Sequence, residues 1–83
     1  MEVKKVIEKA VEYLKKFFPN AERVQLEEVE LSDDDKFWNI TLSYEDLEPS
    51  PGYITFGKKR FYKIFKIDTN NMEVRSMKIR DLK

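Results

Sequence analysis

Hydrophobic positions recur at three- and four-residue steps through the first 18 residues of the chain. Glu and Lys fill the positions between them, and this spacing predicts one amphipathic helix over about residues 2–18. Pro19 disfavours helical geometry at Phe18, so we expect the helix to end there. Its apolar stripe is formed by Val3, Val6, Ile7, Ala10, Val11, Leu14 and Phe17.

Apolar and polar residues then alternate in two segments, at about residues 23–31 and 36–45, which predicts an antiparallel pair of strands. In the first strand the apolar phase changes parity between Leu26 and Val29, so we expect a bulge near Glu27 and Glu28. In the second strand Trp38 should anchor the core beneath the helix. The residues that share its face are Trp38, Ile40, Leu42 and Tyr44.

The last third of the chain, Lys58 to Arg80, predicts a basic β-hairpin with strands at about 59–67 and 73–80. On its first strand one face carries Phe61, Phe65 and Ile67, and the other carries Tyr62 and Ile64. On its second strand simple alternation puts Met77 and Ile79 on the face opposite Val74. The turn Asp68–Asn71 offers Asn where a positive φ is expected.

The stretch from Glu45 to Gly57 predicts a loop, because it contains two of the three Pro and both Gly residues of the chain. Tyr53, Ile54 and Phe56 within it are apolar, so we expect part of the loop to fold back over a sheet edge or to form a short strand. These elements together predict a single α+β domain over residues 1–83. In it one N-terminal amphipathic helix packs on one face of a four-stranded antiparallel sheet, arranged as a meander.

Charge is distributed unevenly although the net charge is zero. Residues 21–50 carry ten acids against two bases, whereas residues 51–83 carry nine bases against three acids. Acidic strands that lie beside basic ones would cancel this asymmetry through cross-strand pairs. We expect such cancellation within the sheet.

The run from Tyr62 to Val74 resembles the closing strand-turn-strand of PepSY-type domains, in which an alternating strand leads through an Asp and a Thr-Gly turn into a second strand. Asn70 and Asn71 stand here where that family has its turn Gly, and the segments 21–24 and 38–42 are compatible with the family's first hairpin. The resemblance implies a helix packed on a curved antiparallel sheet. It also implies a binding or inhibitory role towards other proteins, often peptidases.

Composition argues against catalysis and against a membrane location. The chain has no His and no Cys and shows no catalytic motif, so we expect neither an enzyme nor a cofactor. The run Asp33-Asp34-Asp35 is typical of a turn and lacks the spacing of a calcium loop, so we expect no metal. The N-terminal segment mixes charges with apolar residues and predicts no signal peptide or membrane span, which favours a cytoplasmic protein.

A sheet covered by one helix leaves its second face open, and apolar groups on an open face mark a contact surface. We therefore expect a small protein-binding or self-associating module of unknown biological role, with its binding residues on the terminal hairpin. Pattern alone does not separate a foreign partner from a homodimer. The alternative is nucleic-acid binding through the basic aromatic hairpin 58–80. The candidate binding residues are Arg60, Tyr62, Ile64 and Lys66.

Overall fold

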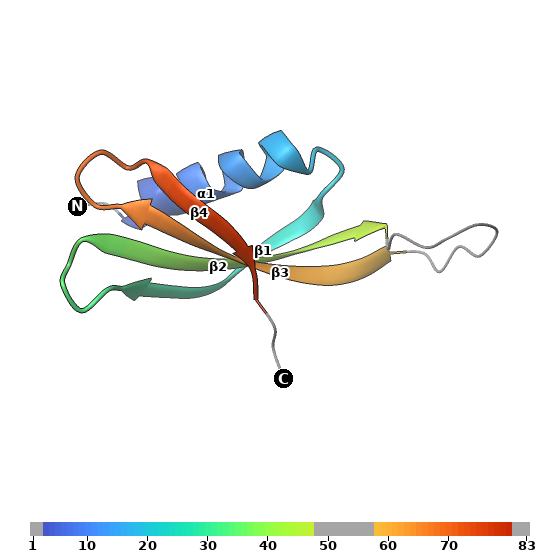
Figure 1. Ribbon diagram of the computed structural model, residues 1–83. Helices are drawn as coiled ribbons and strands as arrows, with labels where there is room; N and C mark the ends of the chain where they lie inside the picture. The colour runs from blue at the N-terminus through green and yellow to red at the C-terminus, as the bar shows by residue number, and fades with distance from the viewer. Residues whose placement is uncertain (1–2, 48–57, 81–83) are drawn as a thin grey trace.

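One helix and four antiparallel strands form the protein, which confirms the α+β fold predicted from the pattern (Figure 1). The computed structural model describes residues 3–47 and 58–80. The strands follow one another across the sheet in the order β1-β2-β3-β4, as expected for a meander. The elements are α1 (Val3–Phe17), β1 (Glu22–Leu31), β2 (Phe37–Leu47), β3 (Lys58–Asp68) and β4 (Val74–Ile79).

Helix α1 lies across one face of the sheet and buries the centre of its apolar stripe there (Figure 1). Val6, Ala10 and Leu14 are fully buried, at the four-residue spacing that keeps them on one side of the helix. The backbone N–H of Phe18 still donates to the carbonyl of Leu14 at 2.8 Å, and Pro19 follows directly. The helix therefore ends where the sequence predicts, with Phe18 held against its last turn.

Strands β2 and β3 form the centre of the sheet through eleven consecutive residue pairs without a register shift. This regular pairing places the alternate apolar residues of both strands on the face that α1 covers. Ile40 lies opposite Phe65, and Tyr44 lies opposite Phe61. Trp38 packs against this core, as predicted. The buried core consists of Val6, Ala10, Leu14, Ala21, Ile40, Leu42, Tyr44, Phe65 and Ile67.

Strand β1 is an irregular edge strand. Its pairing with β2 shifts between Leu26 and Glu28, which confirms the predicted bulge, and shifts again between Glu22 and Gln25. Arg23 lies within the shift between Glu22 and Gln25 and has a φ of 51°, in the left-handed region. The shift between Leu26 and Glu28 places Val29 on the same face as Leu26, since one extra residue reverses the alternation.

The expected orientation of Val74 is wrong. The pairing of β3 with β4 shifts between Lys66 and Ile67, so that Val74 lies opposite Ile67 while Met77 lies opposite Phe65. Both Val74 and Met77 pack against the core beneath α1. One extra residue in β4 moves Val74 to the covered face, which strict alternation cannot anticipate.

The residue with a positive φ in the last turn is Met72, at 59°, rather than an Asn. The side chain of Asp68 accepts hydrogen bonds from the backbone N–H groups of Asn70 at 2.8 Å and Asn71 at 3.4 Å. The N–H of Met72 then donates to the carbonyl of Asp68 at 2.9 Å. The turn is thus closed over five residues, and the left-handed position comes one residue later than predicted.

Strand β2 extends beyond its predicted end at about residue 45, through Asp46 to Leu47, which pairs with Lys58 at the start of β3. Asp46 and Leu47 fall in the predicted loop because of the Pro and Gly that follow them, although acidic residues extend a strand when a basic strand lies beside it. The prediction for Tyr53, Ile54 and Phe56 lies outside the described residues.

Candidate functional site

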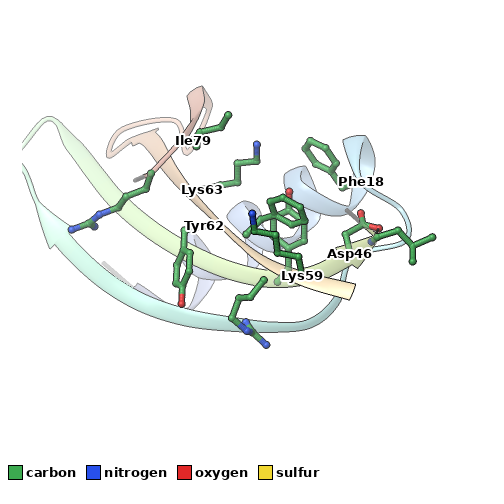
Figure 2. A pocket seen from close by; sticks show the side chains of 11 residues that line it. Phe18, Asp46, Lys59, Tyr62, Lys63 and Ile79 are labelled. Carbon is green, nitrogen blue, oxygen red and sulfur yellow. Dashed lines mark hydrogen bonds between the residues drawn. The ribbon is translucent and has the colours of Figure 1, made fainter. Parts of the chain in front are cut away.

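An apolar groove lies beside the N-terminal end of β3, and it has a volume of about 490 Å³ (Figure 2). We call it the edge groove. Three aromatic rings form its floor: the centroid of the Phe18 ring lies 5.7 Å from that of Tyr44, which lies 5.7 Å from that of Phe61. The three rings come from the end of α1, from β2 and from β3, so the floor exists only in the folded chain.

The connection between α1 and β1 positions Phe18. The N–H of Ala21 donates to the carbonyl of Phe18 at 3.0 Å, which closes a tight turn through Pro19 and Asn20. Ala21 is itself buried in the core. This turn fixes the chain on both sides of Phe18 and holds its ring over Tyr44.

Two exposed aliphatic side chains flank the aromatic floor. Ile79 is 78% exposed at the end of β4, and Leu47 is 64% exposed at the end of β2. Large apolar side chains at this exposure contribute little to folding, because most of their surface stays in water. A floor of aromatic rings with exposed aliphatic groups beside it is the kind of surface that binds an apolar ligand group.

The charged groups around the edge groove are mostly basic. The Nζ atom of Lys63 lies 5.1 Å from the centroid of the Phe18 ring, and that of Lys59 lies 5.9 Å from the centroid of Phe61. Among the described residues, Arg60 and Arg80 complete the four bases of the lining, and Asp46 is its single acid. The described part of the lining therefore carries more bases than acids, and the ion pairs described below neutralise two of these bases, Arg60 and Arg80.

Arg60 is held on the open face of the sheet by neighbours from β1 and β2. Its Nη1 donates to the hydroxyl of Ser43 at 2.6 Å, and that hydroxyl donates to Oε2 of Glu27 at 2.6 Å. Its Nη2 contacts the carboxylate of Glu45 at 3.5 Å and the carbonyl oxygen of Arg23 at 3.1 Å. These contacts explain why Ser43 is fully buried although it lies on the face that no helix covers.

Arg80 makes a second set of contacts across the same face. Its guanidinium forms an ion pair with Glu28 and donates to the hydroxyl of Thr41 at 2.7 Å. Thr41 is buried as a result, like Ser43. Acidic β1 and the basic end of β4 are thus joined over β2 and β3, so the charge cancellation predicted within the sheet is confirmed for Arg60 and Arg80.

The structure divides the four predicted binding residues between two places on the open face of β3. Arg60 and Tyr62 line the edge groove, whereas Ile64 and Lys66 line a separate shallow hollow at the other end of the face. The Nζ atom of Lys66 lies 4.4 Å from the centroid of the Phe37 ring. Arg60, Tyr62 and Ile64 are half-buried, and Lys66 is exposed.

The other half of the edge groove was not predicted from the sequence; it consists of Phe18, Tyr44, Leu47 and Ile79. The sequence pattern places Phe18 at the end of the helix and Tyr44 on the core-facing side of its strand. No local pattern indicates that these residues meet, because the groove depends on where β4 ends relative to β3.

Within the part of the chain that the structure describes, two ionisable groups have clearly shifted pKa values. Burial, and secondarily the charge of Asp46, raises the pKa of the Tyr44 phenol above its ordinary value of 10.0. The hydrogen bond from Ser32, followed by that from the N–H of Lys36, lowers the pKa of Asp34. Asp34 therefore acts as an acceptor within its own turn. Among the described residues no group of three or more His, Cys, Asp or Glu side chains is arranged to hold a metal ion.

No family model, curated protein or solved structure matches this chain. The resemblance to PepSY-type domains therefore stays a prediction. Within residues 3–47 and 58–80, no helix is both long enough and apolar enough to cross a membrane.

Proposed function

We propose that this chain is a small protein-binding module and that the edge groove is its contact surface. The observation that carries the proposal is the combination of an aromatic floor with Ile79 and Leu47, both largely exposed beside it. Apolar surface that folding leaves in water, next to a concave aromatic floor, is the pattern of a binding site whose partner supplies apolar side chains.

Binding is favoured over catalysis because the described residues of the groove include no pair of groups suited to acid–base or nucleophilic chemistry. Asp46, the one acid among these lining residues, lies among bases, and their aromatic hydroxyls belong to Tyr44 and Tyr62. The chain contains no His or Cys that would supply a base or nucleophile near neutral pH. We extend the proposal to a non-enzymatic protein of the cytoplasm, and the inhibitory role that the PepSY resemblance implies would be one form of such binding.

Nucleic-acid binding through hairpin 58–80 is the second candidate, and one observation favours it. The Phe18 ring beside Lys63 could stack on a base while the lysine contacts a phosphate. Against it, Arg60 and Arg80 already pair with Glu45 and Glu28, and the acids of β1 share the open face. Those carboxylates would repel a phosphate backbone, so a protein partner fits the groove better.

A selection from a random peptide library tests the proposed function. The chain is immobilised, and the peptides it enriches are retested against a variant that combines Leu47→Ser with Ile79→Ser. Because both side chains are largely exposed, the variant should fold like the parent. We expect the enriched peptides to lose at least about tenfold in affinity, which is about 1.4 kcal/mol.

Leu26→Ser is the matched control, since Leu26 is also a large apolar residue at 46% exposure but does not line the groove. Enriched peptides should bind this control as they bind the parent. If no enriched peptide distinguishes the groove variant from the control, the proposed function is wrong.

A further inference from the structure

The open face of the sheet separates its acidic residues from its basic ones. The pairings of the four strands align the side chains of this face in rows that run across the sheet. From β1 to β4, one row consists of Glu30, Asn39, Lys66 and Ser76, and the next consists of Glu28, Thr41, Ile64 and Lys78. In both rows the acid lies on β1, whereas the bases lie on β3 and β4.

Three of the charged side chains in these rows form no ion pair with another described residue, namely Glu30, Lys66 and Lys78. Glu28 differs from them, because it pairs with Arg80. All three unpaired side chains are exposed. The contact of Lys66 with the ring of Phe37 leaves its positive charge in place. These three charges are therefore available to a partner.

The two lysines line the shallow hollow at this end of the open face, which has a volume of about 330 Å³. Ile64 and Phe37 give the hollow an apolar part. Asp34 is the one acid among its described lining residues, and its carboxylate accepts from the hydroxyl of Ser32 at 2.6 Å and from the N–H of Lys36 at 3.1 Å. A carboxylate on a short aliphatic stem, such as that of Glu, suits a site with two bases beside apolar surface.

The face that carries this hollow also carries a side chain that fits it. A two-fold axis parallel to the strands, between β2 and β3, would set β1 of one copy of the chain against β4 of another. Glu30 would then lie opposite the partner's Ser76, with its carboxylate between the partner's Lys66 and the partner's Lys78. A two-fold axis perpendicular to the strands would instead set β1 against β1, and acids against acids. The charge pattern thus favours a single arrangement of two copies.

We propose that two copies of this chain form a dimer by stacking their open faces, with Glu30 of each copy in the hollow of the other. Sheets stacked in this way lie about 10 Å apart with their strands within about 30° of one another. The contact covers Ile64 and Phe37, which are half-buried on a face that α1 does not cover. The inference is independent of the proposed function, because the aromatic floor of the edge groove packs against the core on the helix side of the sheet.

The size of the face sets the expected strength of the dimer. With about 4.8 Å between strands and about 3.3 Å per residue, four strands paired along the length of β4 measure roughly 15 by 20 Å. A contact of this size lies at the low end of specific interfaces, so we expect a dissociation constant above about 10 µM. Sedimentation equilibrium of the full chain, at concentrations up to about 1 mM, measures it.

Charge exchange between the copies tests the contact. Glu30→Lys makes all three charges basic, whereas Lys66→Glu combined with Lys78→Glu makes all three acidic. We expect each variant alone to dimerise at least about tenfold more weakly than the parent, because like charges then meet. An equimolar mixture of the two should form a heterodimer within about threefold of the parent's affinity, since opposite charges meet again. The altered side chains are exposed, so both variants should fold like the parent.

Matched controls make the same changes of net charge on the other side of the molecule. Glu12→Lys is one control, and Lys5→Glu combined with Lys9→Glu is the other. These residues are exposed on α1, which covers the opposite face of the sheet. Each control should dimerise within about threefold of the parent, and mixing the two should not strengthen the dimer beyond that range.

Several outcomes would overturn the inference. A parent chain that stays monomeric at about 1 mM would do so, as would a dimer that the open-face variants do not weaken. A mixture of these variants that forms no heterodimer would remove the contact of Glu30 with the two lysines. A dimer that is weakened by Leu47→Ser with Ile79→Ser, and not by the open-face variants, would move the contact to the edge groove. A monomeric chain whose binding to a single-stranded oligonucleotide is abolished by Lys66→Glu with Lys78→Glu would assign the hollow to nucleic acid.

Discussion

The buried hydroxyl of Ser43 should contribute measurably to stability because it joins two charged side chains. It is fully buried, accepts from Arg60 at 2.6 Å and donates to Glu27 at 2.6 Å. Hydrogen bonds to charged groups contribute about 1.5–3 kcal/mol each when both partners are desolvated. Glu27 is exposed and the Arg60 side chain is 25% exposed, so in Ser43→Ala water replaces much of the hydrogen bonding that the Ser43 hydroxyl gives these two side chains. We expect Ser43→Ala to lower the free energy of unfolding by about 1–2 kcal/mol.

A double-mutant cycle with Arg60→Met separates the contact from other effects of either change. Met keeps the aliphatic stem of the side chain and removes the guanidinium. We expect a coupling free energy of about 1 kcal/mol between Ser43 and Arg60. Urea unfolding, followed by the fluorescence of Trp38, the single Trp of the chain, gives all four values.

Ser76→Ala is the control, since Ser76 is half-buried on the same face of the sheet but on the outer strand. It should change the free energy of unfolding by less than about 0.5 kcal/mol. The reasoning is refuted if the free energy of unfolding of Ser43→Ala lies within about 0.3 kcal/mol of that of the parent. It is also refuted if the effects of Ser43→Ala and Arg60→Met on this free energy are simply additive.

Two further predictions concern groups away from this contact. Because burial raises the pKa of Tyr44 in the folded state, its contribution to stability is present below pH 10.0 and is lost as the pH rises through the folded value. An absorbance titration should show a late-titrating phenol that Tyr44→Phe removes and Tyr62→Phe leaves, and its persistence in Tyr44→Phe would contradict the assignment. Asp35→Gly should raise the free energy of unfolding by about 0.5–1 kcal/mol, since Asp35 has a φ of 60° and its carbonyl, which accepts from Thr69, is retained. Asp33→Gly, in the same turn without a positive φ, should lower it in the same denaturation assay, and an equal gain from both would show that the φ is not the cause.

The fold could be predicted because most elements obey one simple periodicity. Strand β2 alternates without interruption, and the stripe of α1 holds to its helical spacing from Val6 to Leu14. Prediction failed where a single extra residue breaks the period. The shift in β1 left a visible change of parity between Leu26 and Val29, whereas the shift in β4 falls beside Val74, where too few residues follow to reveal it.

The candidate site was less accessible from the sequence for a geometric reason. Arg60 and Tyr62 were recognised because they lie within one strand pattern. Phe18 joins them only through the turn at Pro19, and Ile79 only because β4 ends opposite Lys63. The predicted strands are of nearly equal length, so the pattern does not indicate that β4 ends opposite the middle of β3.

The ion pair between Arg80 and Glu28 has a consequence for how the chain folds. The sheet is a meander, so each strand pairs with its neighbour in sequence and most contacts close short loops. Arg80 and Glu28 are 52 residues apart, and their contact needs all four strands in place. Long-range closures are entropically costly and tend to follow local pairing. We therefore expect this ion pair to form after the rate-limiting step, so that it slows unfolding, leaves the folding rate unchanged and lengthens the lifetime of the native state.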